Sequence, residues 1–289
     1  MIVELEITAM AHGGSGIGRI DGRVVFCPGV IPGDVVQAEI VDDSKKSLWR
    51  AQALSIIQPS PHRVPHIWPE ASIERPVDQR AGGADYGHIA LDYQRELKTD
   101  ILRDSLTRFG GFSEAELGDV KVQSAPGDDE RNGTGWRTRV TLHANEDGEL
   151  GPYAEKTHTV IPVSQLPLAT EAIQTAGVAT TLFEGAHTVR VLDTAGSGLR
   201  LIIDEQAPAD ITEKVGDQEF RLSDHSFWQV HHSAPAVLSD AVARAINPAR
   251  FFADADNADL YAGVGLLGRA MADRVSENVN LTAVESDER

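Results

Sequence analysis

The sequence predicts a multidomain protein of mixed α+β and α/β class, with an OB-like β-barrel, a central antiparallel α+β module and the start of a Rossmann-like domain. Short apolar runs separated by turn signals fill the first 58 residues, as in small barrels. Residues 120–224 show mostly strand patterns, and residues 259–285 read as strand, glycine turn, helix and strand. We expect segments at 1–58, 59–87, 88–224 and 225–289.

Composition limits the function. The net charge of −18 argues against broad, nonspecific attraction to nucleic acid, so RNA contacts have to come from local basic patches. Cys27 is the single cysteine, which excludes an internal disulfide and a thiolate-cluster metal site. No apolar run is long enough to cross a membrane, and the N-terminus lacks the pattern of a secretory signal. We therefore expect a cytoplasmic monomer that does not bind membranes.

The N-terminal barrel is predicted from strand patterns at 2–7, 18–20, 23–27, 34–41 and 48–57. The glycine-rich loop at 11–18 is followed by a turn and a strand, so we interpret it as a bulged hairpin and not as a phosphate-binding loop. The candidate RNA contacts in this segment are Arg19, Lys45, Lys46 and Arg50. With five basic and seven acidic residues, the first 60 residues carry a charge of only −2. The alternative is a solvated face of mixed charge.

Five prolines make residues 59–87 an irregular linker. A helix is predicted from about 91 to 109, ended by Gly110 and Gly111. Apolar side chains at helical spacing, which we expect to pack in a core, are Leu97, Ile101, Leu102, Leu106 and Phe109.

The central module is predicted to contain strands at 136–143, 150–153, 157–163, 188–192, 199–204 and 218–222, with a helix at about 170–183. Alternation along a strand places Arg137 and Arg139 on one face. Two interpretations are open for this pair: contact with RNA phosphates, or a cross-strand ion pair.

A helix is expected from about 235 to 246, after the segment SFWQVHH. His231 and His232 have no third ligand at suitable spacing, so we interpret them as helix-start or surface histidines and expect no metal site.

The glycine turn carries the strongest functional signal. Gly263 permits the turn, Gly265 lets the backbone approach a ligand, and Gly268 lets the helix pack on the strand. Glu285, at the end of the second strand, is placed to accept hydrogen bonds from ribose hydroxyls. The GxGxxG spacing alone also permits an NAD-dependent oxidoreductase.

Several motifs together resemble a known family. AHGGSGIGR and GRVVFCPGVIPGD are similar to a TRAM domain, a small RNA-binding barrel. GWRTRVTL, IPVSQLPLA, SFWQVHHSA and DLYAGVGLLG occur in the order seen in class I uracil-C5 RNA methyltransferases that use S-adenosylmethionine. The resemblance covers nearly the whole chain, and SFWQV followed by DLYAGVG is its most specific part.

The resemblance implies which residues contact S-adenosylmethionine: Gln229, Tyr261, Gly263, Gly265 and Glu285. For Gln229 the alternative is a structural amide that caps the next helix. Asp259, four residues before the first glycine, favours a methyltransferase turn over a nicotinamide-binding one.

The chain departs from the family at a metal site. Many members hold an iron-sulfur cluster on four cysteines, but the matching segment here reads RAGGAD, with Ala81 and Ala84 at two ligand positions. Leu166 stands at a third, and the remaining position is either Arg75 or His66. Alanine and leucine cannot ligate iron, so we expect no iron-sulfur cluster.

A second departure concerns catalysis. Family members attack C6 of uracil with a cysteine thiolate, and a carboxylate helps remove the C5 proton. Both groups are expected downstream of Arg289, and Cys27 matches neither of them. We therefore expect a C-terminally truncated, inactive chain whose full-length parent methylates C5 of a uridine in structured tRNA or rRNA. A noncatalytic RNA-binding protein is the alternative.

Overall fold

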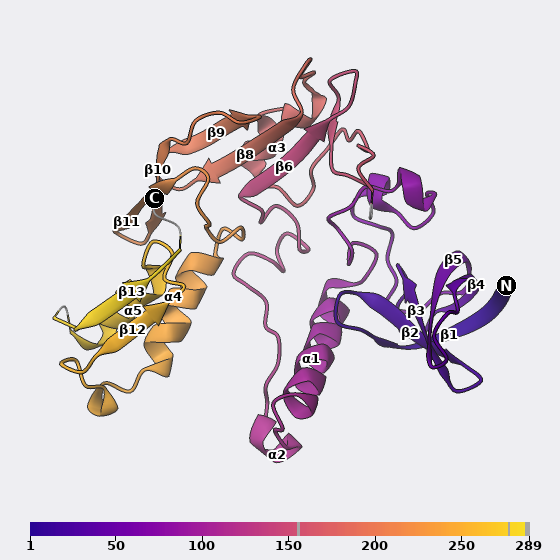
Figure 1. Cartoon of the computed structure of the whole chain (residues 1–289), viewed down its shortest axis with the longest axis horizontal. Helices are drawn as coiled ribbons and strands as arrows, with labels where there is room; N and C mark the ends of the chain where they lie inside the picture. The colour runs from indigo at the N-terminus through magenta and orange to yellow at the C-terminus, as the bar shows by residue number, and fades with distance from the viewer. Residues whose placement is uncertain (155–156, 277, 287–289) are drawn as a thin grey trace. The chain divides into compact units, whose positions relative to one another are not determined.

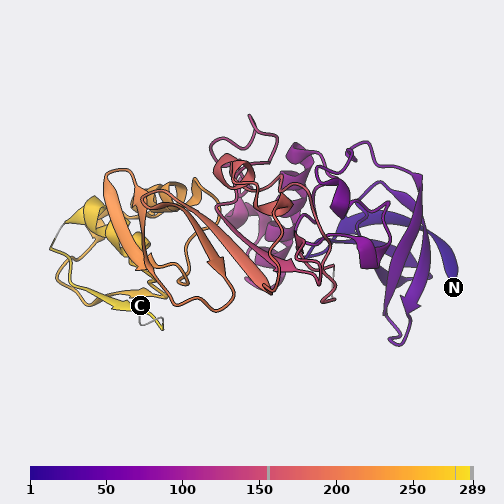
Figure 2. The same cartoon turned by 90° about the horizontal axis from the view of Figure 1, so that it is seen from above.

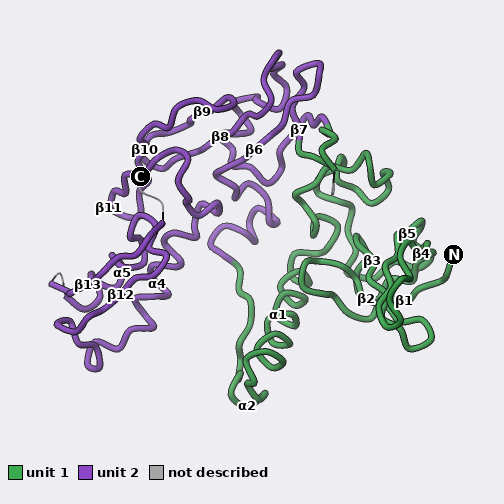
Figure 3. The backbone as a smooth tube through the Cα atoms, viewed as in Figure 1, with its two compact units in different colours: residues 1–124, 152–161 green, residues 125–151, 162–289 purple. Residues whose placement is uncertain are grey.

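The computed structural model describes residues 1–154, 157–276 and 278–286. Two compact units make up the chain (Figure 3): unit 1 contains residues 1–124 and 152–161, and unit 2 contains residues 125–151 and 162–289. The four segments expected from the sequence stay predictions, because a division into two units does not test their three boundaries. No helix among the described residues is long and apolar enough to cross a membrane.

Unit 1 begins with a closed barrel of strand order β1-β2-β3-β5-β4 (Figures 1 and 2). The strands are β1 (Ile2–Met10), β2 (Ser15–Ile20), β3 (Arg23–Pro28), β4 (Val35–Asp42) and β5 (Leu48–Gln58). Alternate side chains such as Leu5, Val25 and Val36 point inward and form its core. The predicted barrel is confirmed, and a register shift between Ile7 and Ala9 gives the β1–β2 hairpin its bulge.

Residues 59–87, all of them described, contain two 3₁₀ turns, η1 (Pro69–Ala71) and η2 (Val77–Gln79), and neither an α-helix nor a strand. This segment is tied to the barrel by the buried carboxylate of Asp34, which accepts hydrogen bonds from Arg63 Nη2 at 2.5 Å and from the backbone N–H of Ser60 at 2.8 Å. The irregular linker is thus an ordered layer against the barrel.

The helix α1 (Leu91–Arg108) is followed by the short α2 (Glu114–Leu117). The prediction that the apolar stripe of α1 packs in a core holds only in part, because Ile101 and Leu106 are half-buried and Leu102 is exposed. Leu97 is buried with Ile31 and Ile89, whereas Phe109 is 88% exposed. The stripe has helical spacing, but among its residues Leu97 alone belongs to a buried cluster of the described chain.

Unit 2 contains an antiparallel sheet of order β7-β6-β8-β9, followed by the hairpin β10-β11. The bounds are β6 (Arg139–Ala144), β7 (Leu150–Gly151), β8 (Thr188–Thr194), β9 (Gly198–Ile203), β10 (Asp210–Val215) and β11 (Gln218–Ser223). The expected antiparallel α+β module is confirmed, although β10 was not predicted.

Two predicted elements of this region are wrong. Residues 157–163 form no strand and make one isolated bridge, between Tyr153 and Val160, because Pro162 has no N–H to continue a ladder. The helix predicted over 170–183 is only α3 (Glu171–Thr175), followed by η3 (Val178–Thr180). Gly177, at φ 67°, ends the helix in the left-handed conformation.

The last part of unit 2 is a strand–helix–strand unit preceded by a helix (Figure 1). Its elements are α4 (Ala234–Ala245), η4 (Pro248–Arg250), β12 (Asn257–Leu260), α5 (Leu266–Val275) and β13 (Leu281–Val284). As predicted, β12 and β13 pair in parallel, and α5 connects them. The helix α4 packs against α5.

Candidate functional site

The glycine turn, residues 261–265, joins β12 to α5. Gly263 and Gly265 have φ angles of 53° and 81°, which glycine adopts without strain. A Cβ at either position would meet no atom within 4 Å, so the backbone faces open space there. Tyr261 also has a positive φ, 62°, and its side chain is 92% exposed. The turn thus presents bare backbone at the start of a helix, where anionic or polar ligand groups are favoured.

Gly268 lies where α5 crosses β12. A Cβ at this position would lie 2.8 Å from Asp259 Oδ2 and 3.0 Å from Leu281 Cδ2. The Gly268 N–H donates to the same Asp259 oxygen at 3.1 Å. Asp259 therefore satisfies one of the free amides in the first turn of α5, and only glycine allows this approach.

The carboxylate of Glu285 faces the glycine turn. Its Oε2 accepts a hydrogen bond from the Gly263 N–H at 2.7 Å. Its Oε1 accepts from the Ser286 N–H at 2.6 Å. The Ser286 hydroxyl also donates to Oε1, at 3.2 Å, so the carboxylate is held beside the turn by backbone and side-chain donors.

Gln229 is placed by its neighbour in the chain. Trp228 is buried in one cluster with Leu266, the first residue of α5, and with Phe220 of β11. The Gln229 side chain is half-buried, and in the described part of the chain its amide makes no hydrogen bond. It does not cap the next helix, because Ser233 is the N-cap of α4 and no side chain caps that position. The amide is therefore available to a ligand.

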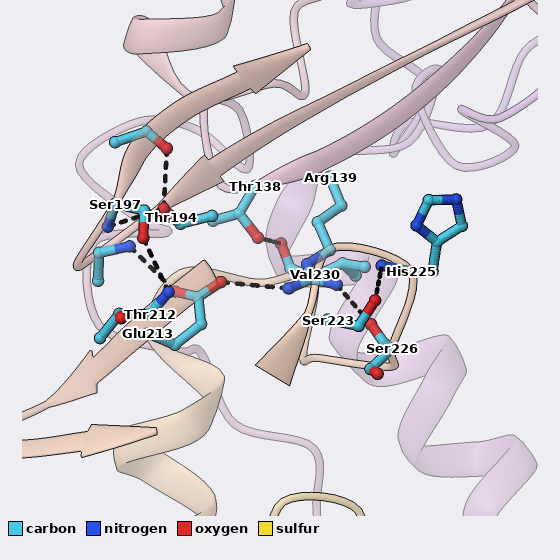
Figure 4. Close-up of polar contacts among 12 residues, drawn as sticks. Thr138, Arg139, Thr194, Ser197, Thr212, Glu213, Ser223, His225, Ser226 and Val230 are labelled. Atoms are coloured by element: carbon cyan, nitrogen blue, oxygen red, sulfur yellow. Dashed lines mark hydrogen bonds and ion pairs between the residues drawn. The ribbon is translucent and has the colours of Figure 1, made fainter. Parts of the chain in front are cut away.

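The start of β6 holds the segment that carries Gln229 (Figure 4). Arg139 Nη1 donates to the Ser226 carbonyl at 2.7 Å, and Thr138 Oγ1 donates to the Val230 carbonyl at 3.0 Å. These two contacts fix both ends of the segment 226–230 on the sheet.

Arg139 also forms an ion pair with Glu213 of β10, with Nη2 and Oε1 3.3 Å apart. Both side chains are nearly buried, at 14% and 4% exposure. Burial raises the pKa of the Glu213 carboxyl, and a hydrogen bond from the Ala195 N–H and the Arg139 guanidinium only partly oppose this. Of the two interpretations left open by the sequence, Arg139 matches the ion pair, although its partner strand is not a neighbour in the sheet.

Arg137 lies just before β6, and its side chain contacts its near neighbours in the chain. Its Nε donates to the Arg139 carbonyl at 3.1 Å, and its guanidinium lies 5.7 Å from the centre of the Trp136 ring. Arg137 precedes the start of β6 but makes isolated β-bridges with Ala169 and His231, so the predicted shared strand face with Arg139 stays a prediction.

The adjacent histidines stack on each other, with ring centroids 5.0 Å apart. The Ser233 N–H donates to His231 Nδ1 at 3.2 Å, so His231 Nε2–H donates to Asp128 at 2.9 Å. The described residues contain no group of three or more His, Cys, Asp or Glu side chains arranged to hold a metal ion.

The predicted RNA contacts on the barrel are all exposed: Arg19, Lys45, Lys46 and Arg50. Hydrogen bonds from Ser44, and the charges of Arg50 and Lys45, hold the pKa of Asp42 below its ordinary value. Lys45 and Arg50 therefore lie on one part of the barrel surface, around the β4–β5 connection.

Cys27 lies inside the barrel core with no exposed surface. Burial, together with the nearby charge of Asp34, raises the pKa of its thiol to about 12, against a weaker opposing hydrogen bond from Ala53. A thiol in this position stays protonated and is out of reach of a substrate.

The segment that matches a cluster motif lines a small cavity of about 190 Å³ together with His66. Ala81 and Ala84 are buried, and the Ala84 carbonyl lies 3.2 Å from His66 Nε2. Nδ1 of the same ring accepts the Trp68 N–H at 2.9 Å. Arg75 donates to the Glu70 carbonyl at 3.3 Å. Both candidate residues for the remaining ligand position are thus engaged by backbone groups.

Sequence reasoning missed Trp228 and Glu213. Trp228 stands in the most specific motif and anchors Gln229, so its place beside the predicted contact was the signal. Glu213 carries no signal of its own, because its partner Arg139 is 74 residues away in the chain.

The chain is similar to several known proteins. Residues 2–54 match the TRAM domain model. The chain is 30% identical to an RNA methyltransferase of Streptomyces coelicolor described as uncharacterized, over 99% of this chain and 69% of that protein. It is 32% identical to a similarly described RNA methyltransferase of Corynebacterium glutamicum, over 96% of this chain and 69% of the relative.

Among solved structures, the chain is similar to the Pyrococcus abyssi tRNA (uracil-54, C5)-methyltransferase in complex with S-adenosyl-L-homocysteine. The TM-score is 0.65 at 18% identity, and the match covers 98% of this chain and 74% of that one. At this identity the likeness concerns the fold.

Proposed function

Since this chain belongs to the RNA methyltransferase family, we propose that its glycine turn binds S-adenosylmethionine as the methyl donor for C5 of a uridine in tRNA or rRNA. The observation that carries the proposal is the open backbone at Gly263 and Gly265, with Glu285 and the available Gln229 amide held on the same unit. The fold likeness to a tRNA uracil-C5 methyltransferase supports the same ligand and the same reaction.

The residues present suit S-adenosylmethionine as a ligand. Open backbone at Gly263 and Gly265 leaves room for close approach, and the Glu285 carboxylate accepts hydrogen bonds as a ribose requires. Tyr261 offers an exposed aromatic ring beside the turn, and Gln229 offers both a donor and an acceptor. When bound, the cofactor supplies an electrophilic methyl group.

RNA binding is assigned to the TRAM barrel and its exposed cations, with Arg137 as a further contact. The chain as a whole repels polyanions, so these cations have to provide the local attraction. A target uridine within a folded RNA would have to leave its stack to be methylated.

The chemistry of C5 methylation requires a nucleophile. A thiolate adds to C6 of uracil, C5 then takes the methyl group, a base removes the C5 proton, and the thiolate leaves. Cys27 is the only cysteine of this sequence, and its burial rules it out as that thiolate. We therefore expect the 289-residue chain to bind cofactor and RNA without methylating C5.

Calorimetry with S-adenosylhomocysteine and with NAD tests the ligand. We expect heat of binding with S-adenosylhomocysteine and none with NAD. The affinity for S-adenosylhomocysteine should fall at least tenfold in the Glu285→Ala protein. Binding of NAD in its place would overturn the proposal in favour of an oxidoreductase.

Transfer of a labelled methyl group to tRNA and rRNA transcripts tests the reaction. We expect none from this chain, and turnover that persists in the Cys27→Ala protein would contradict the thiolate argument. A second candidate, a noncatalytic RNA-binding protein, is favoured by the burial of Cys27 and would be indicated by RNA binding without any binding of S-adenosylhomocysteine.

A further inference from the structure

Unit 1 contains a cavity of about 570 Å³, here called the barrel groove. One wall is the outer surface of β3 and β5, and the other is the segment 73–80, which includes η2. The volume lies in the range of about 300–1,000 Å³ that is typical of sites for small ligands. The groove belongs to a different unit from the glycine turn.

The strands expose an aromatic ring beside a guanidinium at this wall. β3 and β5 pair in parallel, and Phe26 stands opposite Arg50 in the register. Because Val25 and Cys27 point into the core, the intervening Phe26 points outward into the groove. Ile73 and Val77 line the opposite wall. The groove therefore has apolar surfaces on both sides.

Its charge is unlike that of the whole chain. Arg50 and Arg80 line the groove, and its described lining includes no Asp or Glu, although the chain has a net charge of −18. Arg80 is fixed by hydrogen bonds to the carbonyls of Ile73 and Arg75, at 2.9 and 2.7 Å. In the part of the chain that the structure describes, the exposed Arg50 guanidinium makes no hydrogen bond or ion pair, so its donors are available.

A third feature of the groove is a polar side chain that can distinguish between base edges. Gln52 lines the groove on the same strand as Arg50 and is exposed. Its amide can both donate and accept hydrogen bonds, as the edge of a nucleobase requires. Two apolar walls, one amide and an available guanidinium suit a flat heterocycle that carries a phosphate.

We infer that the barrel groove binds one unpaired nucleotide of the RNA, with its base between Phe26 and the Ile73–Val77 wall and its phosphate on Arg50. This rests on the proposed function for the RNA itself and adds a site to it. The groove would hold a nucleotide that is recognised but not modified, because the proposed cofactor site belongs to the other unit.

The first test is binding of a fluorescent tRNA transcript to the whole chain, measured by anisotropy. Arg50→Gln removes the phosphate contact, and Val77→Trp fills the groove from the linker side. Lys121→Gln is the matched control, because it removes one exposed charge of unit 1 that does not line the groove. We expect both groove variants to weaken binding about tenfold and the control to weaken it less than twofold.

The second test locates the nucleotide. Single-stranded RNA that contains 4-thiouridine should crosslink to the peptide of β3 or of β5, and Val77→Trp should abolish the adduct while thermal unfolding shows an intact fold. Adducts found elsewhere only, or groove variants that bind like Lys121→Gln, would overturn the inference. Displacement of the RNA by an equal concentration of uridine monophosphate would also overturn it, in favour of a site for free nucleotides.

The outcomes separate the two proposals. S-adenosylhomocysteine should bind the groove variants as it binds the unaltered protein, because the glycine turn lies in unit 2. If tRNA binds but the groove variants behave like the control, only the groove assignment fails. If the unaltered chain binds no RNA at all, the proposed function fails with it.

Discussion

Replacing Arg139 by glutamine distinguishes its two interpretations, a structural ion pair and a phosphate contact. The change leaves the Glu213 carboxylate, 4% exposed, with the Ala195 N–H at 3.0 Å as its remaining hydrogen-bond donor. Breaking a buried pair by removing one partner costs about 3–5 kcal/mol. Because burial already raises the pKa of Glu213, the carboxyl can take up a proton, so we expect the lower end, about 3 kcal/mol.

The loss should be local to unit 2 and should reach Gln229. Arg139 holds the Ser226 carbonyl, so its removal frees one end of the segment that carries the amide. Hydrogen exchange of the β6 and β10 amides should accelerate, and the affinity for S-adenosylhomocysteine should fall about tenfold or more. The double variant Arg139→Met, Glu213→Leu should recover most of the stability, because no charge stays buried.

The phosphate interpretation predicts a different result. RNA affinity would fall, the slope of its salt dependence would decrease by about one, and exchange in unit 2 would stay as in the unaltered protein. That combination would refute the structural role assigned to Arg139.

Three other substitutions test separate parts of the account. Gly268→Ala should cost about 1–3 kcal/mol, because its Cβ would lie 2.8 Å from Asp259 Oδ2, and combining it with Asp259→Ala should cost less than the sum; additive effects in hydrogen exchange of α5 would contradict this. Cys27→Ala should leave cofactor and RNA binding unchanged, and a loss of RNA binding from a protein with unaltered thermal stability would contradict the thiol's confinement to the core. His88→Gln should reduce acid sensitivity, because burial, with the charges of Arg63 and His66, lowers the pKa of His88 from 6.5 to about 3. The His88 side chain resists protonation in the native state but not in the unfolded state, so the free energy of unfolding decreases as the pH falls from 6.5 toward 3, by up to about 1.4 kcal/mol per pH unit. Equal shifts of the melting temperature for variant and parent between pH 7 and pH 5 would contradict this.

The barrel and the strand–turn–helix–strand unit could be predicted because their signals are local. Turn residues and period-2 alternation mark each barrel strand within a few positions, and two glycines define the turn before α5 while a third lies in the first turn of that helix. The close approach at Gly268 followed from the same spacing, and the structure bears it out.

The missed elements depend on distant partners. The strand β10 was not predicted because Glu213 interrupts its apolar alternation, and this acid is buried only because Arg139 lies opposite. The helix predicted over 170–183 ends before Gly177, because this residue adopts a left-handed backbone conformation that an α-helix does not continue through. Phe109 has helical spacing with Leu97, but unit 1 provides no surface to bury it.

The cofactor residues were assigned by resemblance, and the structure adds the reasons for their places. Trp228, which is buried in one cluster with Leu266, fixes the position of the neighbouring Gln229. The backbone N–H of Gly263 donates a hydrogen bond to the Glu285 carboxylate. None of these contacts can be deduced from one unaligned sequence, because each joins side chains that approach only once unit 2 has folded.

The most direct test of the central claim is the response of the Gly263 and Gly265 amide resonances to S-adenosylhomocysteine in ¹⁵N-labelled protein. The account predicts saturable shifts at both glycines and at Glu285, no comparable shifts with NAD, and a weaker response in Glu285→Gln. Shifts that occur only outside unit 2, or glycine resonances that stay unmoved while the ligand binds, would contradict it.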